Sequence, residues 1–565
     1  MDIRTYDLVC IGGGGAAILA AVYAASEGKS VALVTKDYPG GGNTRLAVGM
    51  TACPGILDND SADIFSADLL RSGEGINEPA AVKTFAGEAA RHVAALEELG
   101  PIFRRDSNGI FGPGVVAQIG GHSKPRSIKN LGGGVSLGAS LKTALWRYGV
   151  TVYSYTAALE LLKVQGRVIG LLALDLRTGI FLGLDCCAVL IATGGCGALY
   201  YPHTTNSRGA VGDGLALGLK AGAVLWDMEQ VQAIPFGLTR PRSMIGALCG
   251  EPSTAGPAGR LLDGSGNILI DGGINKMTRA AVTRIMMSAI NEGKTDSHGG
   301  LLLDLRPNLS LANGEKIYRV IRSNGMFNII GIAYGIKAYH WEEPWSVMPT
   351  YHYQMGGIKV NRHGETGVSG LLAAGEVQAG LHGGNRLGSV ALSEIYTVGT
   401  RAGIAAGSHN ISRNMASISR VDTKGLFREL AKGWKEIFSG KGQHNPERLR
   451  ANLEGCMWQL AGPVKKEAAL LKALEELDRL SAESKNLKIN QEKVFNRQIL
   501  DTVELHLMLP AARALVLSAL ERKESRGAHL RSEYPAPNDK EFKCHTYIRM
   551  SENGSMESGL APLES

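Results

Sequence analysis

The sequence predicts an α/β protein, in which a Rossmann-like dinucleotide-binding domain carries an inserted α+β capping domain and is followed by a C-terminal helical domain. Three observations predict this fold. The chain opens with a strand–helix–strand pattern around a glycine-rich loop, two later apolar stretches also end in glycine-rich loops, and two stretches of different character interrupt or follow these elements. At 565 residues, the chain is long enough for several domains.

The opening pattern is a βαβ unit. Its expected strand, helix and second strand lie at residues 7–11, 16–26 and 30–35. Between the first strand and the helix, Gly12, Gly14 and Ala17 have the spacing of a dinucleotide-binding loop. In such a loop the first glycine makes the turn, the second admits a pyrophosphate, and the last small residue lets the helix pack on the strand. A glycine-rich turn without a ligand is the alternative, but the strand before it and the helix after it favour the dinucleotide.

Two other strand ends repeat this arrangement far along the chain. The stretch 186–197 is typical of a buried strand that ends in Ala-Thr-Gly-Gly, and 370–392 is typical of a strand, a Gly-Glu pair, a glycine-rich loop and a helix. Between the first and second of these ends, 151–177 has the alternation of a β-meander. Because only glycine lets the main chain come very close to a ligand, the three ends together indicate one large dinucleotide.

We expect the domain boundaries where this pattern is interrupted. The dinucleotide-binding domain takes residues 1–235 and 346–408, the capping domain takes 236–345, and the C-terminal helical domain with its tail takes 409–565. The last region is charged and helix-periodic, whereas its tail after residue 533 has weak periodicity.

Composition argues against several classes of protein. No run of about 18 uncharged apolar residues occurs, so we expect no direct membrane insertion, and the lack of a leader pattern at the N-terminus predicts a cytoplasmic chain. The net charge of +7 is spread along the chain and aromatic residues make up only 6%, which argues against nucleic-acid binding. Eight cysteines without a C-x-x-C pair predict neither disulfides nor a metal or iron–sulfur site on this chain.

A series of motifs, in order along the chain, resembles those of one known family. The motifs are GGGGAAILAA at 12–21, GGHS at 120–123, ATGG at 192–195, GAVGDGLALGLKAGA at 209–223, MPTYHYQMGGI at 348–358, AAGEVQAGLHGGNRLGS at 373–389 and ESRGAHLRSEYP at 524–535. Over nearly its whole length the chain is similar to the flavoprotein subunits of the succinate dehydrogenase and fumarate reductase family, which also includes L-aspartate oxidase.

The resemblance implies an FAD cofactor and makes the first domain an FAD-binding domain. It implies that Gly12, Gly14 and Ala17 lie at the pyrophosphate, and that Asp213 and Glu376 are acidic contacts to the nucleotide or the ribityl chain. The other residues matched to cofactor contacts are Gly15, Thr35, Lys36, Asn43, Thr44, Gly121, His122, Ser123, Thr193, Gly194, Arg386 and Ser389. The second strand ends in Thr-Lys, where an NAD site places an acid, and this favours FAD.

The resemblance also predicts how the flavin is held. Succinate dehydrogenases of this family attach FAD through a histidine in a Ser-His-Thr turn. The matching segment here is Gly42-Asn43-Thr44. Because asparagine has no imidazole nitrogen, we expect the FAD to be bound without a covalent link.

The family reaction moves a hydride between the flavin and one carbon of a dicarboxylate, while an arginine handles the proton on the neighbouring carbon. Arg386 matches the arginine that holds one carboxylate, a task suited to a two-pronged guanidinium, and His352 matches the histidine that helps it. Arg279 matches the arginine that delivers the proton. The alternatives are that His352 is a core or surface group and that Arg279 is one exposed position on a helix that also carries Arg284.

The groups that hold the second carboxylate and supply the proton depart from the family pattern. Ile234 stands in the position of a family histidine, Pro252 in that of a glutamate and Ala255 in that of a relay arginine. A shift of one or two residues in the alignment leaves Glu251 or Thr254 able to serve. No such shift provides the histidine, so we expect a substrate with a less polar group at that end.

The sequence therefore predicts an FAD-dependent oxidoreductase of the fumarate reductase and succinate dehydrogenase type. It is expected to act on a carbon–carbon bond next to the carboxylate of a carboxylic-acid substrate, which need not be fumarate or succinate. Because the chain lacks cluster ligands, an iron–sulfur electron-transfer subunit is the expected partner. The alternative is a non-catalytic electron-transfer subunit whose FAD remains but whose substrate cleft has decayed.

Overall fold

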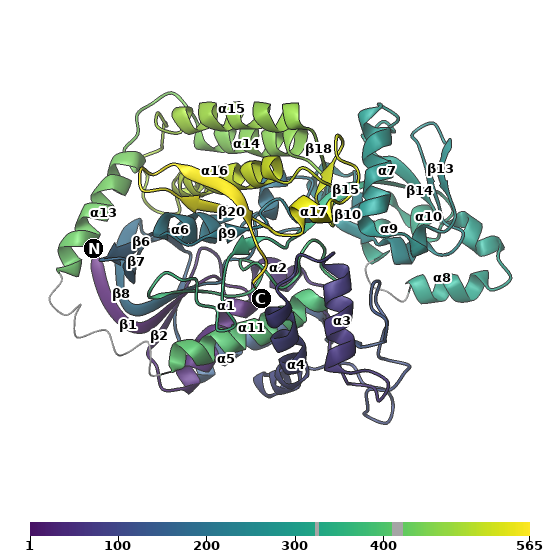
Figure 1. Cartoon of the computed structure of the whole chain (residues 1–565), viewed down its shortest axis with the longest axis horizontal. Helices are drawn as coiled ribbons and strands as arrows, with labels where there is room; N and C mark the ends of the chain where they lie inside the picture. The colour runs from purple at the N-terminus through teal and green to yellow at the C-terminus, as the bar shows by residue number, and fades with distance from the viewer. Residues whose placement is uncertain (323–326, 409–421, 565) are drawn as a thin grey trace.

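A computed structural model of the chain describes residues 1–322, 327–408 and 422–564. In the view of Figure 1 the N-terminal strands lie on the left, the inserted domain lies on the right, and a layer of C-terminal helices runs along the top.

The core of the first domain is a seven-stranded sheet with the order β5-β2-β1-β8-β7-β6, in which β17 also pairs with β8. The strands are β1 (Asp2–Ile11), β2 (Val31–Thr35), β5 (Thr151–Ser154), β6 (Thr156–Val164), β7 (Arg167–Asp175), β8 (Ile180–Ile191) and β17 (Leu371–Ala373). Strands β5, β2, β1, β8 and β17 are parallel, whereas β6, β7 and β8 form an antiparallel meander. The parallel strands therefore end at one edge, where the glycine-rich loops follow them.

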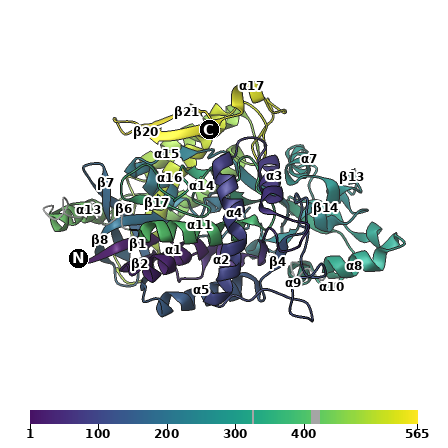
Figure 2. The ribbon, with the colours of Figure 1, turned by 60° about the horizontal axis from the view of Figure 1, so that its bottom comes forward.

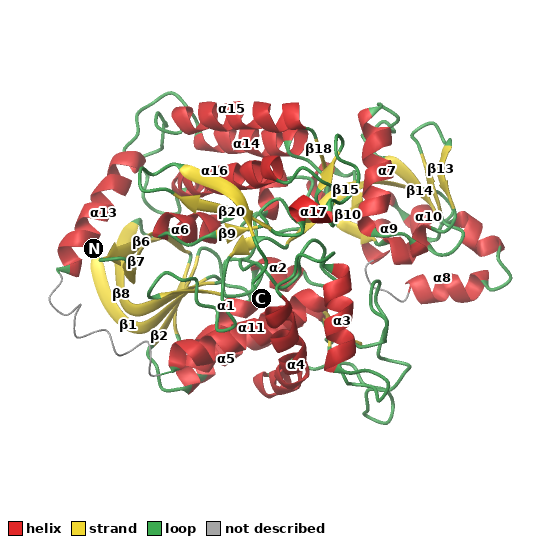
Figure 3. Ribbon diagram, in the orientation of Figure 1, coloured by secondary structure: helices red, strands yellow, loops and turns green. Residues whose placement is uncertain are grey.

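Alternating side chains of the sheet bury both of its faces. Leu8 and Cys10 pack into one core and Val9 and Ile11 into another, as expected where successive side chains of a strand point to opposite faces. The first core includes α1 (Gly15–Ser26), α5 (Gly133–Arg147) and α11 (Val390–Gly407), and the second includes α6 (Asp213–Ala221). Helices thus cover the sheet on both sides (Figure 3).

The turn between β1 and α1 requires glycine. Gly12 has a φ of +133°, and a Cβ atom there would lie 2.2 Å from the carbonyl oxygen of Ala192 and 3.3 Å from the Cβ of Ala17. A side chain at this position would therefore push β1, α1 and the end of β8 apart. The chain between β2 and β5 also forms α2 (Gly42–Leu46), β3 (Met50–Ala52), α3 (Ala62–Ser72), α4 (Pro79–Ala95) and β4 (Ser127–Lys129).

The inserted domain is a six-stranded sheet with helices packed against it. Its order is β11-β10-β15-β14-β12-β13 and every pair is antiparallel. The strands are β10 (Val231–Leu238), β11 (Leu248–Gly250), β12 (Arg260–Leu262), β13 (Ile268–Asp271), β14 (Leu301–Asp304) and β15 (Trp345–Gln354). The helices are α7 (Arg279–Asn291), α8 (Gly314–Arg322), α9 (Asn328–Tyr334) and α10 (Ile336–Tyr339).

Two strands connect the inserted domain to the first domain. In β10, Val231 packs in the core of the first domain and Phe236 in that of the inserted domain, and in β15 the same holds for Tyr351 and Val347. The boundaries expected at 235/236 and 345/346 therefore fall within β10 and at the first residue of β15.

The C-terminal region adds helices and a β-hairpin. The helices are α13 (Thr423–Phe438), α14 (Pro446–Leu460), α15 (Glu467–Glu483), α16 (Arg497–Glu521) and α17 (Asp539–Phe542), with the short strands β18 (Val464–Lys465) and β19 (Leu530–Arg531). The tail forms the hairpin of β20 (His545–Met550) and β21 (Met556–Ala561), which is seen at the top of Figure 2. This hairpin joins β9 (Leu225–Trp226) and β16 (Gly357–Ile358) in a four-stranded sheet.

The C-terminal helices share a core with the first domain. Leu453, Leu470 and Leu515 are buried in the same cluster as Val9 of β1. The boundary expected at residue 409 lies outside the described residues. Within the described part of the chain, one helix, Arg497–Glu521, is long and apolar enough to cross a membrane by length and composition, and 72% of its most apolar window is buried inside the protein. The cytoplasmic location stays a prediction.

Candidate active site

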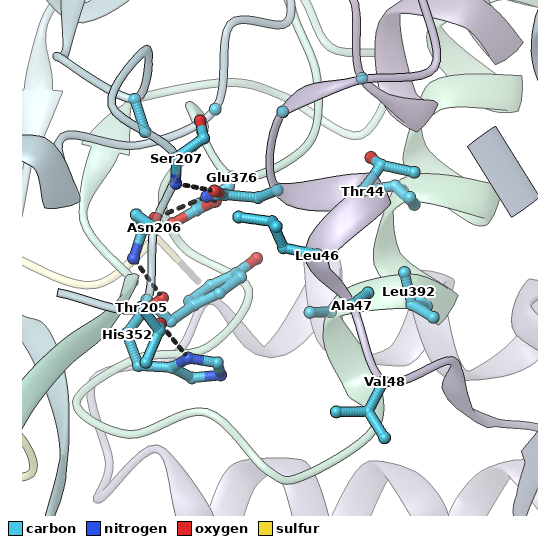
Figure 4. A pocket seen from close by; sticks show the side chains of 18 of the residues that line it. Thr44, Leu46, Ala47, Val48, Thr205, Asn206, Ser207, His352, Glu376 and Leu392 are labelled. Atoms are coloured by element: carbon cyan, nitrogen blue, oxygen red, sulfur yellow. Dashed lines mark hydrogen bonds between the residues drawn. The ribbon is translucent and has the colours of Figure 1, made fainter. Parts of the chain in front are cut away.

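A cavity of about 1640 Å³ extends from the glycine-rich edge of the large sheet to the inserted domain, and residues of both domains line it. It exceeds the roughly 300–1,000 Å³ typical of small-molecule sites, as a dinucleotide together with a substrate requires. In Figure 4 the labelled polar residues Thr205, Asn206, Ser207, His352 and Glu376 lie on one side, and Thr44, Ala47, Val48 and Leu392 lie on the other. Among the labelled residues, one side is therefore polar and the other is mostly apolar.

The structure brings most of the predicted cofactor residues to this cavity. The wall includes Gly12, Gly14, Gly15, Thr35, Lys36, Asn43, Thr44, Gly121, Thr193, Gly194, Asp213, Glu376, Arg386 and Ser389. Most of these residues come from the ends of β1, β2, β8 and β17 and from the loops that follow them, whereas Asn43 and Thr44 lie in α2, Asp213 begins α6 and Gly121 lies in the segment before β4. The three glycine-rich strand ends thus lie around one cavity, although they are far apart in the sequence.

Three predicted residues do not reach the cavity wall: Ala17, His122 and Ser123. Ala17 lies behind Gly12, where its small side chain allows α1 to pack closely on β1. The imidazole of His122 is buried, and its Nε2 lies 2.8 Å from the carbonyl oxygen of Gly388. Burial holds the pKa of His122 below its ordinary value, so this ring is a neutral structural link.

Ser123 is held by a buried ion-pair cluster. Its backbone N–H and hydroxyl both donate to Asp68, at 2.8 and 2.9 Å. The same carboxylate accepts a hydrogen bond from Arg126, which also pairs with Asp60. The buried guanidinium of Arg126 requires carboxylate partners, and Asp68, one of them, also holds Ser123 of the GGHS segment. Gly121 of the same segment faces the cavity.

The glycine loop fits a pyrophosphate. Helix α1 begins at Gly15 in the cavity wall, and its N-cap Gly14 makes no side-chain cap hydrogen bond to the first N–H groups of the helix. The N–H of Gly15 donates to the hydroxyl of Thr44 at 2.9 Å. The buried hydroxyl of Thr193, at the end of β8, has no partner among the described residues. These groups suit the oxygens of a dinucleotide.

At the end of β2 the ammonium of Lys36 pairs with two carboxylates. Its Nζ lies 2.8 Å from Asp213 and 2.8 Å from Glu504. Burial alone would lower the pKa of Lys36, but the two carboxylates raise it above its ordinary value. Asp213 was predicted from the sequence, whereas Glu504 was not, because it comes from α16 at the other end of the chain.

Asn43 is fixed in place by polar neighbours. Its Nδ2 donates to Asn206 at 2.5 Å and to Glu376 at 3.4 Å, and its Oδ1 accepts from the N–H of Ser207 at 2.9 Å. Glu376 also accepts from the N–H of Gln354, and burial raises the pKa of Glu376 to about 7. The asparagine thus joins α2, the loop after β8 and the loop after β17 at the cavity.

The predicted catalytic arginines meet at one glutamine. The Oε1 of Gln232 accepts from Arg279 at 2.6 Å and from Arg386 at 3.3 Å. Arg279 also donates to both carboxylate oxygens of Glu251, at 2.8 and 2.7 Å. Sequence reasoning missed Gln232 and placed Pro252 in the position of the glutamate. The structure brings Glu251, the alternative that the sequence left open, to Arg279.

Arg386 is a buried cation without a carboxylate partner in the described structure. Its side chain is 4% exposed, its Nη1 donates to the carbonyl of Leu387, and its Nε has no partner among the described residues. The guanidinium lies over the ring of Tyr353, with its carbon 4.5 Å from the ring centre. Burial, and then the nearby Arg279, lower the pKa of Arg386 to about 10. Such a group favours an anionic ligand.

His352 lines the cavity beside the two arginines. Its Nδ1 lies 2.7 Å from the hydroxyl of Thr205. Burial, then Arg386 and Arg279, hold the pKa of His352 well below its ordinary value of 6.5, so the imidazole is neutral. A neutral imidazole with one nitrogen bonded to a hydroxyl has its other nitrogen available to a ligand.

The inserted domain contributes a wall of mixed polarity. Ile234 and Ala255 are fully buried and do not reach the cavity. The residues that line it from the inserted domain are the apolar Ala247, Leu248, Pro252, Met277, Val320 and Ile329 and the polar or charged Glu251, Ser253, Thr254, Asn275, Lys276, Thr278 and Arg279. Thr254 supports Glu251 from behind, since its hydroxyl accepts from the N–H of Glu251 at 2.9 Å and donates to its carbonyl.

A dinucleotide cradle at the edge of a parallel sheet, with an arginine–histidine cluster beneath an inserted domain, defines a flavin-dependent oxidoreductase. The profile described as "FAD binding domain" matches residues 7–392, and the one described as "Fumarate reductase flavoprotein C-term" matches residues 450–564. The chain belongs to the fumarate reductase and succinate dehydrogenase flavoprotein family. The predictions of this family, of the fold class, of an FAD-dependent oxidoreductase and of an FAD cofactor are confirmed.

Two curated relatives match over nearly their whole length. A fumarate reductase (CoM/CoB) subunit of Methanothermobacter marburgensis is 31% identical over 541 residues, which cover 94% of this chain and 95% of the relative. The fumarate reductase flavoprotein subunit of Mycobacterium tuberculosis is 32% identical over 592 residues, which cover 99% of this chain and 97% of the relative. Among solved structures, the E. coli quinol fumarate reductase FrdA superposes with a TM-score of 0.88 at 27% identity, covering 100% of this chain and 98% of that one.

Proposed function

We propose that this flavoprotein transfers a hydride between FAD and a carbon–carbon bond next to a single carboxylate. The observation that carries the proposal is Arg386, a buried guanidinium without a carboxylate partner in the described residues, which shares Gln232 with Arg279. Bound FAD supplies the hydride acceptor or donor. The side chains of this chain bind and orient the acid and handle its proton.

Arg386 and His352 bind the carboxylate. The unpartnered Nε and the weakly bonded Nη2 of Arg386 suit the two oxygens of a carboxylate, and charge-assisted pairs of this kind are short and strong. Thr205 bonds to Nδ1 of His352, and in the tautomer in which the hydroxyl donates to Nδ1, Nε2 carries a hydrogen and donates to the same carboxylate. The ring of Tyr353 below the guanidinium limits its movement.

Arg279 and Glu251 handle the proton. An arginine ordinarily keeps its charge because its pKa lies above about 12, so an arginine acid needs a neighbour that returns the proton. Glu251 meets this need, since both of its oxygens accept hydrogen bonds from Arg279. The Nη1 of Arg279 donates to Gln232, which also contacts Arg386. This contact keeps the guanidinium of Arg279 beside the acid that Arg386 binds.

The remainder of the substrate is less polar than a second carboxylate. Ile234, in the position of the family histidine, is buried and supplies no polar group to the cavity, and Leu248, Pro252 and Met277 are among the residues that line the cavity from the inserted domain. A 2-enoate with an apolar substituent, or the corresponding saturated acid, fits this wall better than fumarate or succinate.

A panel of acids tests the proposed function. The flavoprotein, reduced with an artificial donor, would be mixed with fumarate, substituted fumarates and monocarboxylic 2-enoates, and flavin reoxidation would be followed by absorbance. We expect a monocarboxylic enoate to react fastest. If no acid reoxidises the flavin and no saturated acid reduces it, the chain is an electron-transfer subunit with a decayed cleft.

We also propose that the chain works as the flavin subunit of a complex with an iron–sulfur subunit. Within the described residues no group of three or more His, Cys, Asp or Glu side chains is arranged to hold a metal, and the curated relatives above are named as subunits. Purification from the native source tests this proposal. A lone active flavoprotein that turns over rapidly with oxygen would refute it.

A further inference from the structure

Two aromatic side chains at the far end of the cavity have unusual backbones. Tyr155 and Phe495 have φ values of +53° and +49°, a left-handed conformation that is costly for residues with bulky side chains. Tyr155 follows β5 in the large sheet, and Phe495 lies just before α16. Both line the cavity, and their rings lie edge to face with centres 6.5 Å apart.

The rings are exposed despite this strain. Tyr155 is 40% exposed and Phe495 is 65% exposed, so neither conformation is explained by burial of the side chain in a core. Strained residues that persist at a cavity wall commonly serve a ligand, and an exposed aromatic pair is a surface on which a flat ring can stack.

The pair lies at the adenosine end of the dinucleotide cradle. In a βαβ unit the pyrophosphate lies at the glycine loop and the ribose near the end of the second strand. Here that strand end carries Lys36, and Tyr155 is joined to the residue that follows it, because the N–H of Tyr155 donates to the carbonyl of Asp37 at 3.0 Å. The aromatic pair therefore lies beyond Lys36, on the side where the base of a bound dinucleotide would lie.

Backbone hydrogen bonds join the C-terminal region to this end of the cavity. The N–H of Leu176 donates to the carbonyl of Tyr155 at 2.8 Å, and the N–H of Phe495 donates to the carbonyl of Leu176 at 3.0 Å. In the next helix Glu504 pairs with Lys36 at 2.8 Å. Phe495 and Glu504 both lie beyond residue 392, where the match to the FAD-binding profile ends.

We propose that Tyr155 and Phe495 form an aromatic clamp for the adenine ring of FAD, in which one ring stacks on the base and the other contacts its edge, and through which the segment before α16 closes the cofactor site. The proposal depends on the FAD cofactor and is independent of the substrate. Stacking of a base on an aromatic side chain is worth about 1–3 kcal/mol, which corresponds to roughly a 5- to 150-fold change in dissociation constant.

Binding of three ligands to the apoprotein tests the clamp. FAD, ADP and FMN would be titrated by calorimetry into the wild type and into Phe495→Leu and Tyr155→Leu. ADP carries the adenine without a flavin, and FMN carries the flavin without an adenine. We expect each variant to weaken FAD and ADP by roughly 5- to 150-fold and to leave FMN within about twofold.

Two control variants separate stacking from damage to the fold. Phe495→Tyr keeps the ring and should bind FAD as the wild type does. Trp146→Leu removes an aromatic side chain that is 59% exposed but does not line the cavity, and it should bind all three ligands normally. Equal weakening of FMN and FAD, or unchanged FAD binding in both leucine variants, would overturn the proposal.

Proteolysis provides a second readout. The segment before α16 contains Lys485, Lys488 and Lys493, all sites for trypsin. If the clamp closes this segment on the cofactor, FAD slows cleavage there, FMN does not, and the Phe495→Leu variant loses the protection. Equal protection by FMN would assign the effect to the flavin half of the site and contradict the clamp.

Discussion

Arg279 and Glu251 form a two-point ion pair in the wall of the cavity, with nitrogen–oxygen distances of 2.8 and 2.7 Å. The glutamate comes from the turn after β11 and the arginine from the first residue of α7. This pair restores the carboxylate that the family alignment placed at Pro252. A proton path through Arg279 therefore remains available, although Ala255 provides no relay arginine.

The first prediction concerns this pair. Glu251→Gln keeps the shape of the side chain but removes the charge that accepts and returns the proton. Loss of a charge-assisted hydrogen bond costs about 1.5–3 kcal/mol, so we expect kcat to fall by about tenfold to a hundredfold or more. Single-turnover reoxidation of the reduced flavin by the best acid of the panel measures the effect.

The matched control for this variant is Glu292→Gln, just after the end of α7. Glu292 pairs with Lys294 on the surface and does not line the cavity. It should leave kcat unchanged. A Glu251→Gln enzyme as fast as this control would exclude Glu251 from proton transfer.

The second prediction concerns the hydroxyl of Thr205. Thr205→Val removes the hydrogen bond to Nδ1 of His352 and leaves that ring free to turn or to change tautomer. We expect the dissociation constant of an unreactive carboxylate to rise by about tenfold, with FAD binding unchanged. Thr205→Ser keeps the hydroxyl and should restore binding. Equal affinity in Thr205→Val and Thr205→Ser would show that the bond does not position His352.

The sequence identified the catalytic arginines but not all of the side chains that contact them. The glycine loops, Arg386 and His352 follow from short motifs, because backbone geometry and charge fix those residue types locally. Gln232 and Ile234 could not be assigned in this way. The pairing of β10 with β15 shifts register between Gln232 and Ala233, and such a bulge changes which side chains face a cavity. Gln232 therefore bonds to both arginines while Ile234 is buried.

Other side-chain positions depend on contacts between residues that are distant in the sequence. His122 and Ser123 face away from the cavity because Arg126 draws the segment toward Asp60 and Asp68. Glu504 reaches Lys36 only after α16 has packed on the large sheet. Local sequence patterns contain no information about such pairings, whereas the βαβ opening and the glycine-rich strand ends were predictable.

The third prediction concerns pH and the stability of the apoprotein. The pKa of Glu376 is raised from 4.5 to about 7 by burial, so the folded state holds this proton more tightly than the unfolded state. Its contribution to stability is fully present below about pH 4.5 and is lost as the pH rises through 7. We expect a loss of about 3 kcal/mol over this range, seen as a fall in the urea midpoint.

Glu376→Gln isolates this contribution. The variant cannot ionise, so the difference in unfolding free energy between wild type and variant should change with pH between about 4.5 and 7 and stay flat above that range. Parallel pH profiles for the two proteins would show that Glu376 does not titrate with a raised pKa.

The fourth prediction concerns the link between protein and cofactor. Because Asn43 stands in place of the attaching histidine, acid precipitation should release all of the flavin into the supernatant. Asn43→Ala removes the hydrogen bonds to Asn206, Glu376 and Ser207, and we expect FAD affinity to fall by about tenfold. Yellow colour that stays with the precipitated protein would contradict the noncovalent assignment.

The last prediction concerns fumarate itself. In the family pattern a histidine and a relay arginine act on the second carboxylate and the proton, and this chain has the buried Ile234 and Ala255 in their positions. Since Glu251 is retained, two charge-assisted contacts are lost rather than three. At about 1.5–3 kcal/mol each, their loss slows fumarate reduction by roughly a hundredfold to ten-thousandfold relative to an enzyme that has both. A monocarboxylic enoate does not need those contacts, so kcat/KM for the best enoate should exceed that for fumarate.

Arg386→Lys should lower kcat/KM for the enoate and for fumarate to a similar degree, because both substrates present one carboxylate to the side chain at position 386. Fumarate turnover above about 10 per second that is abolished by Arg279→Ala would show instead that the chain is an ordinary fumarate reductase flavoprotein.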